Sequence, residues 1–322
     1  MSSALGIDYR LKGEGRLTVV ITQGLGSASA EWWPIQDALA QRARVLTWDR
    51  PGYGESGRPR SPRTPANVAG EALKLLQGVA PEGPLVLVGH SQGGLYTNAL
   101  ARLVRHRVRG VALLDPAHPD NGRMRRELPP RVFRNSGSDL AVRLRTGNTV
   151  ARFHLMGILK PVIMGAPPFT FCRRHPPAAR RAMWRHLKRP EAYQAALAEY
   201  QELEFRTAPS DLETLGPFPS VPLRILVHDP EVLTTDMSAR LSRAEAAQVE
   251  AIWGELLREQ ASLSPLGRTE TAGGSGHLIH LEKPELALAA ISELVSAAGR
   301  QAAGGSRPGR QTRHQPRGPR KR

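Results

Sequence analysis

The sequence is poor in several features, and each scarcity excludes a class of protein. Its 322 residues include one cysteine, Cys172, so an intrachain disulfide is impossible and nothing indicates an oxidising compartment. No segment approaches the roughly 20 apolar residues of a transmembrane helix. The first residues have neither the basic start nor the apolar run of a secretory signal. We therefore expect a cytoplasmic protein.

Acidic residues are few relative to basic ones, 29 against 45, which gives a net charge of +16. Residues 299–322 contain eight of the basic residues and no acidic one, and they are rich in Gly, Pro and Gln. Because such a segment cannot bury a core, we predict a disordered basic tail. The tail could make weak, salt-sensitive contacts with anionic surfaces. We favour a solubilising role and expect no specific nucleic-acid partner.

Signals for metals and cofactors are also weak. The ten histidines are scattered without the spacing of a zinc site. Gly24-Leu25-Gly26 follows an apolar run and could begin a dinucleotide-binding turn, but Ser29 stands where the third glycine belongs. The predicted helix also begins well beyond these glycines. We expect neither a cofactor nor a metal.

The most informative stretch runs from Leu85 to Leu103. Four apolar residues indicate a buried strand, the G-x-S-x-G pattern around Ser91 follows, and the residues after it have helical spacing. In a turn this sharp, a Cβ at Gly89 or Gly93 would collide with the crossing strand and helix. The pattern predicts that the Ser91 hydroxyl is presented above a sheet, beside a helix N-terminus that favours negative charge.

This stretch resembles the α/β-hydrolase superfamily, and the resemblance extends from about Tyr9 to about Ala298. It implies an α/β-hydrolase fold, with a mostly parallel central sheet, helices on both faces and an inserted helical cap. We expect the hydrolase core in residues 1–120 and 221–298, separated by a cap at 121–220 and followed by the tail. In this family Ser91 would be the nucleophile.

The resemblance also implies the supporting groups of the site. The Gly-Gly-Ser-Gly-His segment ending at His277 matches the family's general base. The backbone N–H groups of Leu25 and Gln92 match its oxyanion hole. The turn beginning Asp49-Arg50 resembles a structural turn of the family, and we expect these two side chains to pair.

Two aspartates compete for the position of the triad acid. Asp229 follows the strand after which the family usually carries its acid, but its turn lacks the usual glycine and Pro230 restricts the backbone. Asp115 lies directly at the end of the strand that follows the helix predicted after Ser91. We favour Asp115 by a narrow margin and keep Asp229 as the alternative.

Apolar residues in the first half of the cap carry a further expectation. They are Phe153, Leu155, Met156, Ile158, Leu159, Val162, Ile163, Met164, Phe169 and Phe171. Contact with a membrane surface is one interpretation, because basic residues flank them. We favour the simpler one, in which they pack on the core and line an apolar pocket. Cys172 is expected to pack inside the cap.

These features predict a serine hydrolase without cofactors, acting through an acyl-enzyme. Hydrolysis of small, ester-like apolar acyl substrates is favoured. Acyl transfer or C–C bond hydrolysis would use the same residues, and the sequence does not separate them. The alternative from another class is a non-catalytic protein that binds a small ligand on the same scaffold. The substrate and the oligomeric state are left open.

Overall fold

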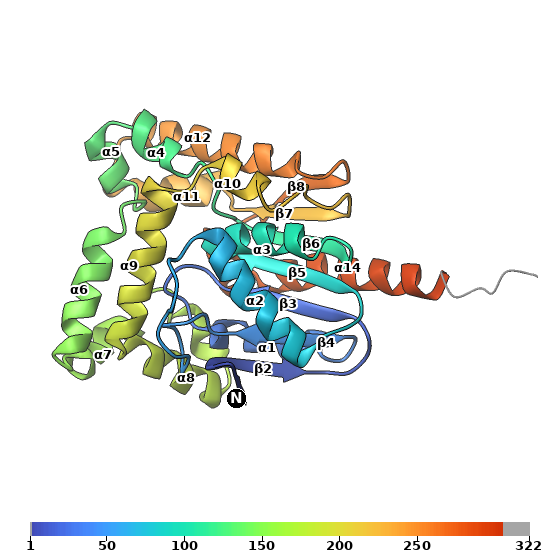
Figure 1. Ribbon diagram of the computed structural model, residues 1–322. Coiled ribbons are helices and arrows are strands. Elements are labelled where there is room, and N and C mark those ends of the chain that lie inside the picture. The colour runs from blue at the N-terminus through green and yellow to red at the C-terminus, as the bar shows by residue number, and fades with distance from the viewer. Residues whose placement is uncertain (1, 305–322) are drawn as a thin grey trace, which may run out of the picture.

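The computed structural model describes residues 2–304, and one sheet forms its centre (Figure 1). The described residues contribute eight strands, in the spatial order β1-β2-β4-β3-β5-β6-β7-β8. Their bounds are β1 (Ser2–Ala4), β2 (Ile7–Lys12), β3 (Thr18–Thr22), β4 (Arg44–Trp48), β5 (Leu85–His90), β6 (Val108–Leu114), β7 (Leu223–Val227) and β8 (Gly267–Thr271). The pairs β1–β2 and β2–β4 are antiparallel, and all other pairs are parallel.

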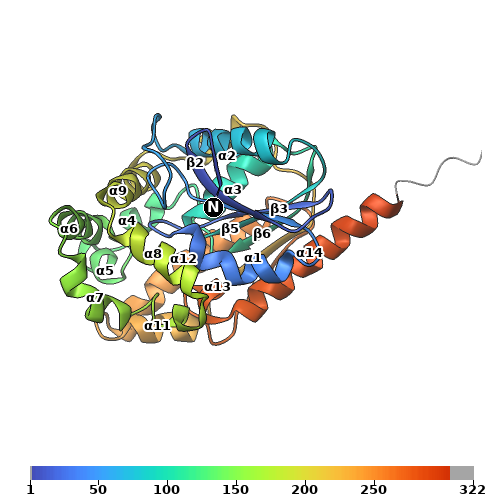
Figure 2. The same ribbon diagram turned by 90° about the horizontal axis from the view of Figure 1, so that it is seen from below.

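Helices cover both faces of this sheet (Figure 2). α2 (Pro65–Val79) and α3 (Gln92–Leu103) lie on one face, and α1 (Trp33–Leu39) and α14 (Pro284–Gly304) lie on the other. Side chains alternate along each strand, so neighbouring residues of β5 enter different cores. Leu85 and Leu87 belong to the core beneath α2 and α3, whereas Val86 and Val88 pack with α1 and α14. The expected α/β-hydrolase fold class is confirmed.

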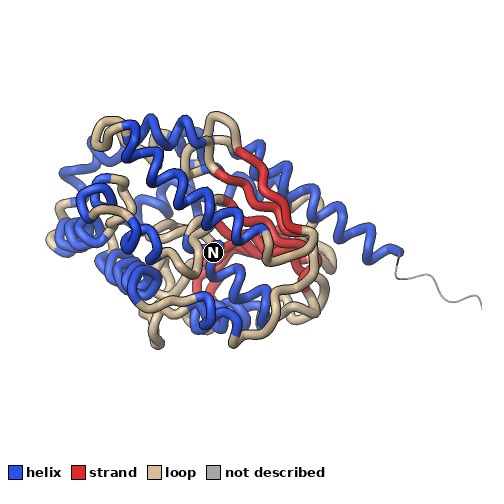
Figure 3. The backbone as a smooth tube through the Cα atoms, turned by 90° about the horizontal axis from the view of Figure 1, so that it is seen from above, coloured by secondary structure: helices blue, strands red, loops and turns tan. Residues whose placement is uncertain are grey.

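The chain between β6 and β7 is helical and gathers at one end of the sheet (Figures 1 and 3). We call residues 121–220 the cap. Its helices are α4 (Gly122–Glu127), α5 (Pro130–Asn135), α6 (Ala141–Arg152), α7 (Met156–Met164), the 3₁₀ turn η2 (Phe171–Arg174), α8 (Pro177–Leu187), α9 (Pro190–Phe205) and α10 (Pro209–Glu213). α6 and α9 pack along each other, and α9 reaches the loops at the sheet's end.

The elements that complete the core follow β7. They are α11 (Pro230–Met237), the long α12 (Arg243–Ala261), which packs on β7 and β8, and α13 (Ile279–Glu282). The short 3₁₀ turn η1 (Ser29–Trp32) precedes α1. No helix within residues 2–304 combines the length and the apolar character needed to cross a bilayer.

Two expectations need correction. α14 continues to Gly304, so residues 299–304 are helical rather than part of a disordered tail. Alanines at 297, 298, 302 and 303 favour continuation of the helix. The remainder of the predicted tail, 305–322, lies outside the described residues.

The second correction concerns the apolar residues of the cap. Met156 and Phe169 are buried, and Cys172 packs beside Phe169 as expected. However, exposure reaches 39% or more at six of the ten: Phe153, Leu155, Ile158, Leu159, Val162 and Phe171. Packing of the whole group on the core was therefore a wrong prediction.

Candidate active site

Ser91 occupies a strained turn between β5 and α3. Its φ of 52° and ψ of −128° lie in a region that residues with a side chain rarely adopt. The surrounding glycines permit this turn. A Cβ on Gly89 would lie 2.5 Å from Thr97 Oγ1 and 2.6 Å from the carbonyl oxygen of Gly93. One on Gly94 would lie 2.5 Å from Pro116 Cβ. The strand, turn and helix predicted around Ser91 are present.

His277 and Asp115 lie in one hydrogen-bonded row with Ser91. The Oγ atom of Ser91 is 3.0 Å from His277 Nε2, and His277 Nδ1 is 2.5 Å from Asp115 Oδ2. Because an ionised carboxylate only accepts hydrogen bonds, Nδ1 of His277 donates to Asp115. Nε2 is then left to accept from the Ser91 hydroxyl, which is the arrangement a general base requires.

Asp115 is fully buried at the end of β6, and a second histidine supports it. Burial alone would raise the pKa of Asp115, but hydrogen bonds from His228 and His277 hold it below its ordinary value. The second carboxylate oxygen, Oδ1, accepts from His228 Nδ1 at 2.7 Å. Asp115 is therefore an ionised acceptor at neutral pH.

His228 lies between two carboxylates. Its Nε2 atom is 2.9 Å from Glu250 Oε2 on α12. Burial would lower the pKa of His228, but its hydrogen bonds to Asp115 and Glu250 outweigh this and raise it to about 10. A protonated His228 donates to both carboxylates. His228 and Glu250 were not predicted from the sequence, although the carboxyl ends of β6 and β7 are adjacent and place Asp115 beside His228.

Asp229, the alternative acid, has other partners. Its Oδ1 atom accepts from the backbone N–H of Glu231 at 3.0 Å and caps α11. Its Oδ2 atom accepts from the backbone N–H of Gly274 at 2.8 Å. The Asp229 N–H donates to the carbonyl of Ser275. Asp229 thus anchors the loop that carries His277, while Asp115 contacts the imidazole.

The backbone N–H groups of Leu25 and Gln92 stand beside Ser91. Both residues line the same cavity as the serine. Within residues 2–304, neither N–H donates a backbone hydrogen bond. The loop approaches closely, since a Cβ on Gly24 would lie 3.2 Å from Ser91 Cβ and 2.9 Å from His90 Nδ1. Two free donors beside a nucleophile can stabilise a developing oxyanion.

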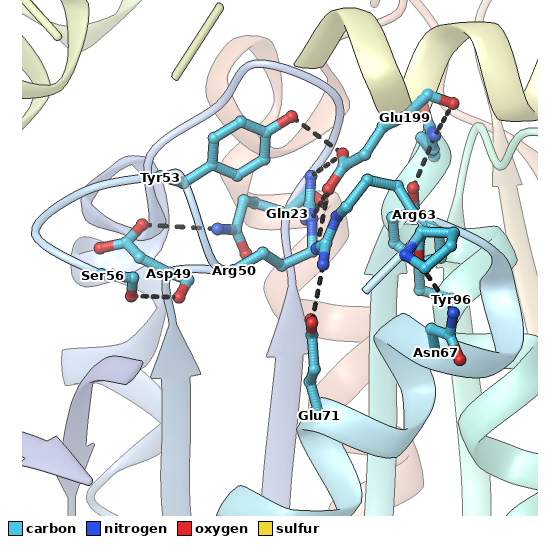
Figure 4. A network of polar contacts seen from close by, with 12 residues as sticks. Gln23, Asp49, Arg50, Tyr53, Ser56, Arg63, Asn67, Glu71, Tyr96 and Glu199 are labelled. Atoms are coloured by element: carbon cyan, nitrogen blue, oxygen red, sulfur yellow. Dashed lines mark hydrogen bonds and ion pairs between the residues drawn. The ribbon is translucent and has the colours of Figure 1, made fainter. Parts of the chain in front are cut away.

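Arg50 fixes the loop before Leu25 and links it to the cap (Figure 4). Its guanidinium donates to the carbonyl oxygens of Gln23 at 2.6 Å and Gly24 at 2.9 Å. The carbonyl of Gly24 and the N–H of Leu25 belong to one planar trans peptide and point in opposite directions. Holding the carbonyl therefore orients the N–H of Leu25.

The partner of Arg50 is Glu199 of α9, not Asp49. Both Arg50 and Glu199 are fully buried, and two hydrogen bonds of 3.0 Å join them (Figure 4). Asp49 instead accepts from the N–H of Ser29 at 2.7 Å and its hydroxyl at 3.0 Å. The expected Asp49–Arg50 pair was wrong because the distant cap helix supplies the arginine's carboxylate. That contact spans 149 positions and leaves no local signal.

Glu199 collects further donors. Tyr53 donates to it at 2.8 Å and Arg63 at 3.2 Å. Burial would raise the pKa of Glu199, but the charges of Arg50 and Arg63 hold it below its ordinary value. The backbone carbonyl of Glu199 also accepts from the side chain of Gln92 at 2.9 Å. The position of α9 is thus coupled to the nucleophile turn and to the loop of Leu25.

Two further histidines surround the site. His90 precedes Ser91 and donates from Nε2 to the carbonyl of His277 at 2.9 Å. Burial holds the pKa of His90 well below its ordinary value, so this histidine is neutral. His280 is buried and stacks on Trp32 with ring centres 4.3 Å apart. His90 thus holds the loop that carries His277.

Two cavities meet at the site. One, of about 400 Å³, contains Ser91 and is lined by Leu203 of the cap and Trp253 of α12. The other, of about 470 Å³, lies between the Leu25 loop and α8. Leu25 and His277 line both cavities. The second cavity is lined mainly by apolar residues, whereas the first combines apolar residues with charged ones, among them Glu204, Asp236 and Arg240.

Comparison with known proteins agrees with this architecture. The sequence profile of the alpha/beta hydrolase family matches residues 19–291, and the chain belongs to that family. An AB hydrolase superfamily protein of Gibberella zeae is 26% identical over 282 residues, covering 86% of each chain. YqjL of Bacillus subtilis is 34% identical over 109 residues, which are 34% of this chain and 43% of that protein. The chain thus matches less than half of YqjL's length.

Solved structures share the fold. A thermophilic esterase from Thermogutta terrifontis superposes with a TM-score of 0.59 and 23% identity, covering 91% of this chain and 93% of the esterase. An enol-lactonase from Burkholderia xenovorans gives a TM-score of 0.55 and 21% identity, covering 90% and 96%. At these identities the likeness concerns the fold.

Proposed function

We propose that this protein is a serine hydrolase that cleaves small, apolar esters through an acyl-enzyme. The observation that carries the proposal is the row of hydrogen bonds from Ser91 through His277 to Asp115. In this proposal His277 takes the proton of Ser91 as the serine attacks the ester carbonyl. The N–H groups of Leu25 and Gln92 stabilise the oxyanion. His277 then protonates the leaving alcohol, and water releases the acyl group.

The charges around Asp115 support this role. When His277 takes up a proton, it becomes an imidazolium, and the buried carboxylate of Asp115 stabilises this positive charge. In the resting state, protonated His228 already compensates the charge of Asp115. We infer that His228 keeps Asp115 ionised without requiring His277 to be protonated. His277 is then available as a base.

The two cavities support a substrate with two apolar parts. A carbonyl held between Ser91 and the two N–H donors would place the acyl part on one side of His277 and the alcohol part on the other. An esterase is also named among the solved structures that share the fold. Together these points favour ester cleavage over simple ligand binding.

The proposal is tested by the turnover of p-nitrophenyl esters with acyl chains of different length. Ser91→Ala should abolish turnover, whereas Ser262→Ala, which changes an exposed serine outside both cavities, should retain it. Unchanged melting temperatures would establish that both variants are folded. Turnover by folded Ser91→Ala equal to that of the wild type would overturn the proposal.

A further inference from the structure

The cap carries an apolar surface that the proposed hydrolysis does not use. Of the residues of α7, Met156 is buried, whereas exposure is 75% at Ile158 and 73% at Val162. Leu155 and Leu159 are also exposed, at 43% and 39%. Steps of three or four residues lead from Leu155, the N-cap of α7, through Ile158 and Leu159 to Val162, so the four lie along one side of the helix. We call this set the α7 stripe.

The segment of the cap that contains the stripe carries charges of one sign. Residues 140–190 contain eleven Lys and Arg and no Asp or Glu. Ten of these cations are exposed. Among residues 2–304, Arg185 is the member of this group that pairs with a carboxylate, that of Glu55. This segment of the cap is therefore cationic, and carboxylates of the described residues pair with almost none of its side chains.

We propose that the α7 stripe and its cations dock this protein onto an anionic lipid surface. Exposed aliphatic side chains on a short helix, flanked by Lys and Arg, are suited to lie in the headgroup region of a bilayer. Lys160 of α7 packs over Trp184 at 5.3 Å, which places a cation and an aromatic ring beside the stripe. The charge favours anionic lipid over a neutral bilayer or a second, equally basic copy of the chain.

The docking surface adjoins the proposed active site. Leu140 and Arg143, near the start of α6, line both cavities, and Pro167 and Phe169, just beyond α7, line the second. The stripe thus lies in the chain between two segments of the cap that line the cavities. Docking does not depend on the proposed hydrolysis and can be measured without it.

The test is co-sedimentation of the full chain with vesicles of phosphatidylcholine alone or with 30% phosphatidylglycerol. We expect binding to the anionic vesicles, weakened by added salt, and little binding to the neutral ones. The variant Ile158→Ser with Val162→Ser should lower the partition coefficient by at least about tenfold. Leu266→Ser, which removes an exposed leucine far from the cap in sequence, is the matched control and should bind as the wild type does.

Melting temperature and p-nitrophenyl ester turnover of the stripe variant should equal those of the wild type, since both substituted side chains are exposed. Equal vesicle binding by the stripe variant and the wild type would overturn the proposal and assign binding to other basic residues. Absence of binding to anionic vesicles would also overturn it. A dimer of the wild type that the stripe variant abolishes would assign the stripe to contact between copies.

Discussion

The Nδ1 atom of His228 lies 2.7 Å from Oδ1 of Asp115, on the opposite carboxylate oxygen from the one that His277 contacts. Two imidazoles therefore share one buried carboxylate. The second oxygen of Asp115 is satisfied by His228, so the carboxylate is held from both sides. Substitutions at Asp115, His228 and the nearby Asp229 should therefore have different effects on turnover and stability.

Asp115 and Asp229 should respond differently to the same substitution. Asp115→Asn removes the charge that stabilises the imidazolium, and we expect kcat to fall by up to about 10⁴-fold. Asp229→Asn weakens the side-chain hydrogen bond at the N-terminus of α11 and the one from Gly274, so it should mainly lower the melting temperature. Steady-state kinetics and thermal unfolding of both variants measure this. A greater loss of kcat in folded Asp229→Asn would assign the acid to Asp229.

His228 should give the protein a pH-dependent stability. Its folded-state pKa of about 10 exceeds the ordinary value of 6.5, so the folded protein holds a proton that the unfolded chain releases. The resulting stabilisation is complete below pH 6.5 and is lost as the pH rises through about 10. Between pH 7 and 10, the free energy of unfolding of wild type should therefore fall more than that of His228→Gln. Parallel pH profiles of the two proteins would contradict this assignment.

Arg50→Lys should lower kcat strongly while lowering the melting temperature only slightly. Lysine keeps the charge opposite Glu199 but cannot donate at once to that carboxylate and to the carbonyls of Gln23 and Gly24. A misoriented Leu25 N–H would remove part of the oxyanion stabilisation, at a cost of about 10²-fold. Kinetics at temperatures well below the unfolding transition test this. An unchanged kcat would show that the loop does not depend on Arg50.

Glu199→Gln should act mainly on stability. It leaves the buried charge of Arg50 without its carboxylate, and such losses cost about 3–5 kcal/mol. Denaturant unfolding measures the change in free energy. Glu191→Gln on the same helix is the control, because its partner Arg58 is exposed and exposed pairs contribute little. Equal stability of the two variants would contradict the role given to the buried pair.

Gly24→Ala should impair turnover with little loss of stability. The new Cβ would lie 2.9 Å from His90 Nδ1, so the loop must shift away from Ser91. A displacement of this kind at a reacting centre costs about 10²-fold in rate. Gly273→Ala, in the loop before His277, is the control, since its Cβ would meet no atom within 4 Å. Similar kcat values for both variants would show that close approach at Gly24 is unimportant.

The sequence predicted the parts of the fold that rest on local patterns. The apolar runs of β3, β5 and β6 are buried on both faces, and this pattern can be recognised without a structure. β2 was not predicted, although Ile7, Tyr9 and Leu11 alternate with polar residues as in a half-buried strand. The individual strands thus have local signals, whereas the antiparallel pairing of β2 with β4 has none.

The candidate site also contains residues with local signals and residues without them. Ser91 and His277 lie in short motifs whose glycines have steric reasons, so the sequence predicted both. The partners His228, Glu250 and Glu199 come from elements far apart in the chain and meet only through the sheet order and the cap. The exposed α7 stripe was mispredicted for a related reason. Apolar spacing identifies the apolar side of a helix but not whether another element covers that side.

The role proposed for Ser91 is tested most directly by active-site labelling followed by mass spectrometry. Wild type incubated with a fluorophosphonate should gain the mass of one phosphonyl group, mapped to the peptide that contains Ser91, and should lose ester turnover in proportion. The variant His277→Ala should label far more slowly, because its serine lacks the base. An adduct on another residue, or full turnover by a protein fully labelled at Ser91, would contradict the proposal that Ser91 is the nucleophile.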